Sequence, residues 1–358
     1  MQRRADFTPC AFASEDVFPG TPVILTDALR RWSALNKWTL ESFAERFHYR
    51  KVQFKYGGLK VTLGEFIPQV LASTPDAPAP YLTNLPNAVH LPELLPEISP
   101  LPDVLQPHWA ERTFLHPRIR REMQRGSMLE LYIGGPGGNF PVLHWDGLST
   151  HAFLMQIAGV KQYWVWPPDD SPHLYPGEAP NISPIRDIEH PDLALYPNFP
   201  RARATTFTLH PGELLFVPSR WWHTARIRSP SITVSTNVLN ESNWHNFTED
   251  MQRNTGAGAR VVKFVHLAAE HAPKARATCW ADAGSARDGT PTRWCGGVIP
   301  LGSRCRMLHD APVGAICPGR GCAAPGSRSS PGARRRRRPR SCPSPQPSIP
   351  SGPPTRVR

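Results

Sequence analysis

The stretch FPVLHWDGLSTHAFLMQIAGVKQYWVWPP, residues 140–168, places three polar side chains in a pattern that otherwise predicts buried β-strands. They are His144, Asp146 and Lys161. Burial costs roughly 2–7 kcal/mol for a neutral polar group, and more for a charge, unless the group is paired or bound to a metal. These residues are therefore the first candidates for a functional site.

His144 and Asp146 stand two residues apart at the end of a strand-like run, so alternation along a strand would place both side chains on one face. Two neutral imidazoles and one carboxylate can occupy one face of an octahedral Fe(II) and leave other positions open for substrates. The second imidazole is expected from His223, in PGELLFVPSRWWHTARI (211–227). Taken alone, His223 is better explained as a core histidine that is hydrogen-bonded to the backbone than as a metal ligand. In combination, the three residues predict a metal site.

The chain carries a second His-x-Asp pair, His190 and Asp192, and the numbers of histidines and acidic residues give about one such pair by chance. This second pair lies in a long segment without periodicity, residues 169–203, and is interrupted by Pro191. We expect it to be a solvated loop. Loops of this length inside a domain are usually functional or disordered, and we expect this one to border the pocket.

Lys161 follows Gly159 at the head of a strand-like run, on the face shared with Tyr163 and Val165. A buried ammonium needs an anion, and the sequence offers no obvious one. A dicarboxylic co-substrate would supply it, since lysine acts as a compact point charge. The alternative is a side chain whose stem lies along the sheet while its head reaches water. The residues alone leave both interpretations open.

Short strands must position these side chains. Eight strand-like runs separated by Gly and Pro predict an all-β sandwich or barrel rather than alternating βαβ units. They cover residues 128–135, 140–146, 151–159, 161–168, 204–212, 213–219, 223–229 and 231–239.

Mixed elements flank this core. Before it, we expect a strand in 21–29, a helix in 37–47 that starts near Thr39 with a nearby Glu, a hairpin in 51–66 and a short helix in 63–72. After it, 240–253 and 259–272 predict two helices. The expected organisation is an N-terminal α+β region packing on the barrel (1–127), a barrel core (128–242), C-terminal helices (243–272) and a disordered basic Pro/Arg/Ser-rich tail (273–358).

Charge and cysteine separate the body from the tail. Residues 271–358 hold 16 Lys or Arg against three acidic residues, whereas 1–270 hold 25 against 26. The basic charge of the chain therefore says nothing about partners of the folded part. Arg334–Arg338 would suit phosphate attraction or a nuclear-localisation signal, but the tail composition also fits a non-functional extension. We assign it no function.

Only Cys10 precedes residue 271, which favours a reducing, intracellular compartment, cytoplasmic or nuclear. The six later cysteines form no CxxC pair, which makes a zinc module an unfavourable interpretation. No run of 18 apolar residues predicts a membrane span.

In their order along the chain, LYIGGPGGNFPVLHWD, HAFLMQIAGVKQYWVWPPD, HPGELLFVPSRWWHTARI and SITVSTNVLN resemble the JmjC (cupin-like) family of Fe(II)- and 2-oxoglutarate-dependent oxygenases. The similarity covers about residues 20–245 and is strongest to small single-domain members, which include protein hydroxylases and a tRNA-modifying hydroxylase. It implies a double-stranded β-helix, or jelly roll, with flanking N- and C-terminal helices. It also implies that His144, Asp146 and His223 are the iron ligands.

The resemblance further implies contacts with 2-oxoglutarate. Lys161 matches the lysine that binds its distal carboxylate, and Tyr81 resembles a tyrosine that contacts the same group. Asn237 matches an asparagine near the co-substrate, and Ser235 a position often held by Thr.

The chain departs from the family pattern on one side of the pocket. Many members have Thr where this chain has Pro141, and some have Asn where it has Ala152 or Leu154. Thr150 or His151 would substitute, with His151 more readily understood as a core residue.

The implied function is a dioxygenase that uses Fe(II), 2-oxoglutarate and O2 to hydroxylate a protein side chain. The same ligands are compatible with demethylation, where the carbon bears a methylamine nitrogen, and with tRNA hydroxylation. A different class of function is a non-catalytic cupin-like metal-binding or interaction module, against which the complete ligand set and Lys161 argue. Residues 243–272 would pack on the barrel or, alternatively, form a homodimer.

Overall fold

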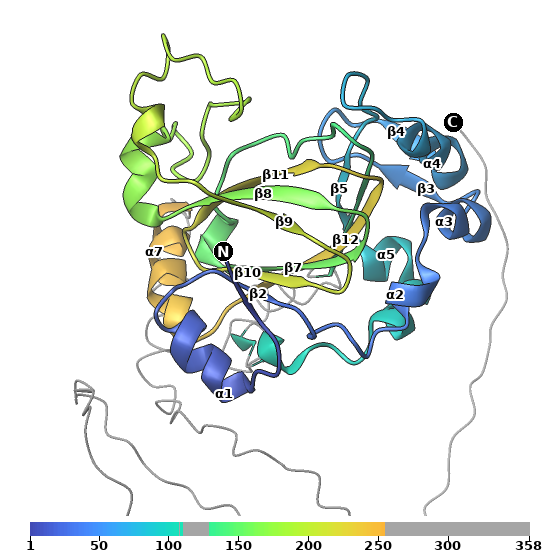
Figure 1. Ribbon diagram of the computed structural model, residues 1–358, viewed down its shortest axis with the longest axis horizontal. Coiled ribbons are helices and arrows are strands. Elements are labelled where there is room, and N and C mark those ends of the chain that lie inside the picture. The colour runs from blue at the N-terminus through green and yellow to red at the C-terminus, as the bar shows by residue number, and fades with distance from the viewer. Residues whose placement is uncertain (107, 110–128, 255–358) are drawn as a thin grey trace, which may run out of the picture. The chain divides into compact units, whose positions relative to one another are not determined.

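The computed structural model describes residues 1–106, 108–109 and 129–254. Its centre consists of two β-sheets that face each other (Figure 1). A seven-stranded sheet has the order β1-β2-β10-β7-β12-β6-β5, and a three-stranded sheet has the order β11-β8-β9. All pairings are antiparallel except that of β1 with β2. This arrangement confirms the all-β jelly-roll core.

The strands of the large sheet are β1 (Gln2–Arg4), β2 (Val23–Leu25), β5 (Leu82–Pro86), β6 (Glu130–Gly134), β7 (His151–Ala158), β10 (Leu214–Val217) and β12 (Ser231–Val238). Those of the small sheet are β8 (Lys161–Trp166), β9 (Thr205–Leu209) and β11 (Trp222–Ile227). The N-terminal region thus adds β1 and β2 at one edge of the large sheet and β5 at the other.

Alternation along the strands divides the large sheet into two faces. On β7, Phe153, Met155 and Ile157 belong to a core cluster shared with the N-terminal helices, while Ala152 and Leu154 line a pocket between the sheets. The outer face is thereby covered by residues 1–105, and the inner face is left for the site.

The flanking α-helices in the described residues are short, and several 3-10 turns lie between them. They are α1 (Pro9–Phe12), α2 (Ala34–Lys37), α3 (Leu40–Arg46), α4 (Leu63–Leu71), α5 (Asn87–His90) and α7 (Trp244–Asn254). A hairpin of β3 (Lys51–Gln53) and β4 (Lys60–Thr62) lies between α3 and α4, as expected. None of the described helices is long and apolar enough to cross a bilayer.

Two helix starts follow their capping residues. Thr39 caps α3, but its partner in the capping box is Ser42 rather than the expected Glu. Thr62 and Glu65 form a complete box at the start of α4.

One expected strand is absent. Within residues 140–146 only His144 forms isolated bridges, to Ile182 and to His223, and the preceding Asn139 forms another with Arg226. Pro141 has no N–H to donate to a ladder, which explains why this run does not become a regular fourth strand of the small sheet. The expected helix in 259–272, the tail at 273–358 and the boundary at 127 lie outside the described residues.

Candidate metal centre

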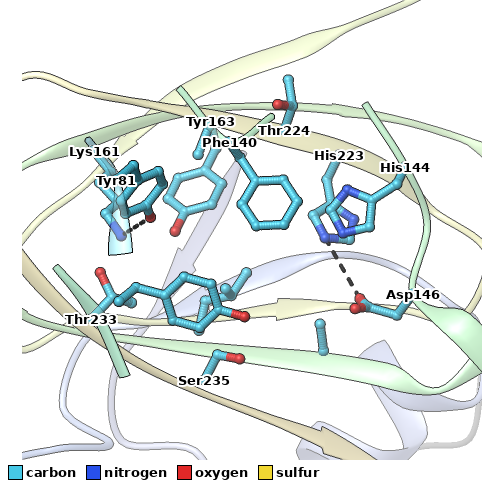
Figure 2. Close-up of a pocket in the computed structure, with 14 residues that line it drawn as sticks. Tyr81, Phe140, His144, Asp146, Lys161, Tyr163, His223, Thr224, Thr233 and Ser235 are labelled. Atoms are coloured by element: carbon cyan, nitrogen blue, oxygen red, sulfur yellow. Dashed lines mark hydrogen bonds and ion pairs between the residues drawn. The ribbon is translucent and has the colours of Figure 1, made fainter. Parts of the chain in front are cut away.

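His144, Asp146 and His223 meet at one end of the space between the sheets (Figure 2). Each offers one ligand atom, and these atoms lie within 4.8 Å of one another. The Nε2 atom of His223 is 3.6 Å from Oδ2 of Asp146, and the two imidazole rings are 4.5 Å apart between centroids. The three side chains proposed from spacing and pattern do converge.

Backbone pairing fixes the two histidines opposite each other. The amide of His223 donates to the carbonyl of His144 at 2.7 Å, and the amide of His144 donates to the carbonyl of His223 at 3.2 Å. Residues that exchange both hydrogen bonds are directly opposed in an antiparallel pair, and their side chains share a face. The bridge therefore aims both rings at the same point.

Hydrogen bonds also select the tautomer of each ring. Nδ1 of His144 lies 3.2 Å from the carbonyl oxygen of Val142, and Nδ1 of His223 lies 3.1 Å from that of Trp221. Because a carbonyl only accepts, Nδ1 carries the proton in both rings and the Nε2 lone pair is left for a metal. Burial, assisted by the neighbouring His223, lowers the pKa of His144 to about 4, which keeps its imidazole neutral.

The insertion at 169–203 holds the ligand segment from its other side. The amide of Trp145 donates to the carbonyl of Asn181 at 3.1 Å, and Nδ2 of Asn181 donates to the carbonyl of Trp145 at 3.0 Å. Ser183 donates from its amide to the carbonyl of Leu143 at 2.9 Å. The segment between the two ligands is thus paired to the insertion and to β11.

No residue of 169–203 belongs to the described lining of the pocket itself. Ile185, Arg186 and Ile188 of the insertion line a neighbouring pocket, which shares Phe140, Thr224 and Ala225 with the first. The second His-x-Asp pair is a surface feature, because His190 is 83% exposed and lies beside Asp187.

A pocket extends from the triad between the two sheets (Figure 2). Aromatic rings form much of its wall, and Phe140 stacks on His144 at 4.7 Å. Its described lining consists of Tyr81, Tyr132, Phe140, His144, Asp146, Ala152, Leu154, Lys161, Tyr163, His223, Thr224, Ala225, Thr233 and Ser235.

Lys161 lies at the end of the pocket away from the triad, beside Tyr81 (Figure 2). Its side chain is 1% exposed, so the alternative of a head that reaches water is wrong. Nζ donates to Oη of Tyr81 at 2.7 Å and lies 5.1 and 5.6 Å from the ring centroids of Tyr81 and Tyr132. No carboxylate of the described residues forms an ion pair with it. Burial lowers its pKa to about 7.

The other expected co-substrate residues fall into two groups. Tyr81 and Ser235 line the pocket. Asn237 and Thr150 are absent from the described lining and bond to each other, Nδ2 to Oγ1, at 3.0 Å. Thr150 also donates to the carbonyl of Gly147 at 3.2 Å, so this pair ties the turn after Asp146 to β12.

His151 is a core residue rather than a ligand. Its Nδ1 accepts from the amide of Ser219 at 3.0 Å, and its Nε2 lies 2.8 Å from Oγ of Ser242. Both ring nitrogens are therefore satisfied, and burial lowers its pKa to about 4.

Two features escaped the sequence analysis. Tyr132 lines the pocket, and its inward position could have been read from alternation on β6.

The second feature is a polar network around Arg220. Arg220, at a φ of 64°, donates to Oγ of Ser149 at 3.0 Å and to Oε2 of Glu249 at 2.7 Å. Ser149 in turn donates to Oδ2 of Asp250 at 2.6 Å, so α7 holds the loops that precede His223 and follow Asp146. No local pattern signals this network.

The sequence model of the cupin-like domain matches residues 44–249, more than half of the chain. The chain belongs to the cupin-like family. This cupin-like chain is 27% identical over 241 residues to lysine-specific demethylase 8 of Danio rerio, a match that covers 63% of the chain and 54% of the relative. It is 25% identical over 232 residues to Jumonji C domain-containing protein 5 of Drosophila melanogaster, covering 60% and 54%. These relatives confirm the resemblance to JmjC proteins.

A shorter region of this cupin-like chain is similar to HSPB1-associated protein 1 of Rattus norvegicus, with 34% identity over 131 residues. That match covers 36% of the chain and 26% of the relative. The matched regions thus span about a quarter of one relative and about half of the other two.

Proposed function

We propose that this chain is a JmjC-type dioxygenase that uses Fe(II), 2-oxoglutarate and O2 to hydroxylate a protein side chain. The observation that carries the proposal is the pairing of two sites in one pocket. A His-Asp-His triad lies at one end, and Lys161, buried and without a carboxylate partner among the described residues, lies at the other. A metal-chelating dicarboxylate satisfies both ends at once.

The donor set fits Fe(II). His144 and His223 present their Nε2 atoms, and Asp146 presents a carboxylate oxygen, which is the two-histidine, one-carboxylate set of non-haem iron oxygenases. When bound, iron with 2-oxoglutarate and O2 supplies the oxidising chemistry that inserts oxygen into a C–H bond. Asp146 also offsets part of the metal's charge.

The remaining residues of the pocket position 2-oxoglutarate and exclude water. Lys161 binds the distal carboxylate of 2-oxoglutarate, with the Tyr81 hydroxyl beside it. Ser235 faces the co-substrate from β12, and the rings of Tyr132 and Tyr163 keep water from the space between. Asn237 and Thr150 act on the co-substrate through the turn after Asp146, which their mutual hydrogen bond holds in place.

In this proposal the substrate is a protein and the compartment is intracellular. The relatives named lysine-specific demethylase 8 and HSPB1-associated protein 1 support a protein as substrate or partner. The product is a demethylated side chain if the reacting carbon bears a methylamine nitrogen. RNA remains a second substrate class, and a non-catalytic metal-binding or interaction module the second class of function.

The test is anaerobic binding of Fe(II) and 2-oxoglutarate to the full chain, followed by measurement of succinate after O2 is admitted. We expect succinate from the wild type and none from His223→Ala. The matched control is His190→Ala, which removes an exposed histidine of the second His-x-Asp pair and should behave as the wild type. Metal binding without succinate from the wild type would favour the non-catalytic module.

A further inference from the structure

A second carboxylate stands near the metal centre. Glu130 pairs with Ser235 across β6 and β12, and it shares the inward face of β6 with Tyr132. Along β12, Thr233 lies beneath Lys161, and Ser235 lies further towards Asp146 (Figure 2). Glu130 is thus the register partner of Ser235 and bonds to Tyr132, so it lies beside two residues of the pocket wall, although it is not part of the described lining itself. Burial is the largest cause of the raised pKa of Glu130, and the charge of Asp146 also contributes to it.

Two side chains hold this carboxylate in place. Oε2 of Glu130 accepts from Nδ2 of Asn84 at 2.6 Å and from Oη of Tyr132 at 3.1 Å. Nδ2 of Asn84 also donates to Oη of Tyr132 at 2.6 Å. Asn84 lies at a φ of 53°, in the left-handed region that asparagine tolerates better than most residues, where the register of β5 against β6 is irregular. The chain departs from regular strand geometry at the residue that orients Glu130.

The arrangement leaves acceptors without donors. No group of the described residues donates to Oε1 of Glu130, and Oδ1 of Asn84 is buried without a donor. Among the described residues, no lysine, arginine or histidine forms an ion pair with Glu130. The ammonium of Lys55 lies over the ring of Tyr56, 5.8 Å from its centroid. Burial is the main cause of the raised pKa of Glu130. A partly buried carboxylate that lacks an ion-pair partner, and has one oxygen without a donor, is stabilised by a ligand that brings positive charge and N–H donors.

We propose that Glu130, oriented by Asn84 and Tyr132, is a specificity-determining residue that accepts hydrogen bonds from a positively charged, N–H-donating side chain of a peptide substrate. The proposal rests on the proposed function for the reaction that follows, but the binding preference itself does not depend on turnover. Glu130 would thus orient the substrate, while the triad and Lys161 serve the metal and co-substrate.

The test compares labelled decapeptides of one Gly-Ser sequence that differ only in the central residue: arginine, lysine, citrulline or norleucine. Binding to the full chain, loaded with Mn(II) in place of Fe(II) and with 2-oxoglutarate, is followed by fluorescence polarisation. Citrulline keeps the N–H donors of arginine and lacks its charge. We expect the arginine and lysine peptides to bind about 10-fold more tightly than the norleucine peptide, with citrulline between them.

The variant Glu130→Gln should remove this preference while leaving the affinities for Mn(II) and 2-oxoglutarate unchanged. Glu45→Gln, a change of the same kind at an exposed position on α3, is the matched control and should keep the preference. A variant that was merely misfolded would lose affinity for every peptide and for the metal, so the ratio between peptides separates the two cases. Asn84→Ala should reduce the ratio part of the way.

Equal binding of all four peptides by the wild type, or an undiminished preference in Glu130→Gln, would overturn the assignment of Glu130. If Mn(II) and 2-oxoglutarate fail to bind, the proposed function fails instead. The peptide comparison on the metal-free chain then still decides the assignment of Glu130. Equal peptide binding that becomes a basic preference in Lys55→Ala would show that Lys55 neutralises Glu130, which also contradicts the proposal.

Discussion

The ammonium of Lys161 donates a 2.7 Å hydrogen bond to the hydroxyl of Tyr81, and the two groups close the end of the pocket away from the metal ligands. The rings around it belong to Tyr81, Tyr132 and Tyr163, and burial raises the pKa of each. These hydroxyls therefore stay neutral over the pH range in which Lys161 titrates. An anion that reaches this end of the pocket meets the positive charge of Lys161 among neutral tyrosine side chains.

The affinity for 2-oxoglutarate should depend on pH through Lys161. Its pKa is about 7 in the free protein, because burial disfavours the charge, and a bound carboxylate should raise it. Affinity should therefore be constant below about pH 7 and fall by up to about 10-fold per pH unit above it, with uptake of a proton on binding. Calorimetric titration in buffers of different ionisation enthalpy measures both effects. A flat profile in the wild type, matching that of Lys161→Met, would contradict the assignment.

The lowered pKa of Lys161 also predicts how the free energy of unfolding changes with pH. Between pH 7 and 10.5 the unfolded chain holds a proton on Lys161 that the folded chain has released. The contribution of this group to the free energy of unfolding should therefore rise with pH across that window, and it is most unfavourable below pH 7. Urea unfolding of the wild type and of Lys161→Met at pH 6.5 and 8.5 isolates the contribution, since only the wild type should gain stability from it.

Removing the hydroxyl of Tyr81 should weaken co-substrate binding without affecting the metal. In Tyr81→Phe the ammonium loses its only hydrogen-bond partner among the described residues, so its charged form becomes less favourable. We expect the Kd for 2-oxoglutarate to rise about 5- to 10-fold, which corresponds to about 1 kcal/mol, with the Kd for Mn(II) unchanged. Tyr49→Phe, at a tyrosine that is 86% exposed, is the control and should bind both as the wild type does.

Features that depend on residues close together in the sequence could be predicted, whereas features that depend on residues far apart in the sequence could not. Alternation and Gly or Pro punctuation are local, and they predict β7, β8 and β12 together with the face that Lys161 shares with Tyr163. The site residues that depend on distant contacts were missed or misplaced. Pro141 breaks the strand that was expected to carry His144 and Asp146, and the insertion replaces the missing ladder through Asn181. Periodicity cannot reveal such a pairing, because an irregular loop has none.

The side chain of Asn181 should contribute to metal affinity although it touches no ligand atom. Its Nδ2 donates to the carbonyl of Trp145, the residue between the two ligands His144 and Asp146. Groups that orient metal ligands typically contribute 10- to 100-fold to affinity. Because the backbone hydrogen bond from Trp145 to Asn181 remains in Asn181→Ala, we expect a loss of about 10-fold, at the lower end. Competition titration with a chelator measures it, and Asn198→Ala, an exposed residue of the same insertion, should show no loss.

Arg220 should stabilise the fold through its side chain and destabilise it through its backbone. Its guanidinium donates to Ser149 and Glu249, which connects the loop before His223 to α7, and loss of such charge-assisted bonds costs about 1.5–3 kcal/mol. Its φ of 64° is a conformation in which glycine is unstrained and alanine is not. Arg220→Ala should therefore lower the free energy of unfolding by about 1 kcal/mol more than Arg220→Gly. Urea unfolding of both variants measures the difference. Equal losses would show that the relief of strain in the glycine variant is cancelled by the entropic cost of a flexible glycine, and a larger loss in the glycine variant would show that this cost outweighs the strain.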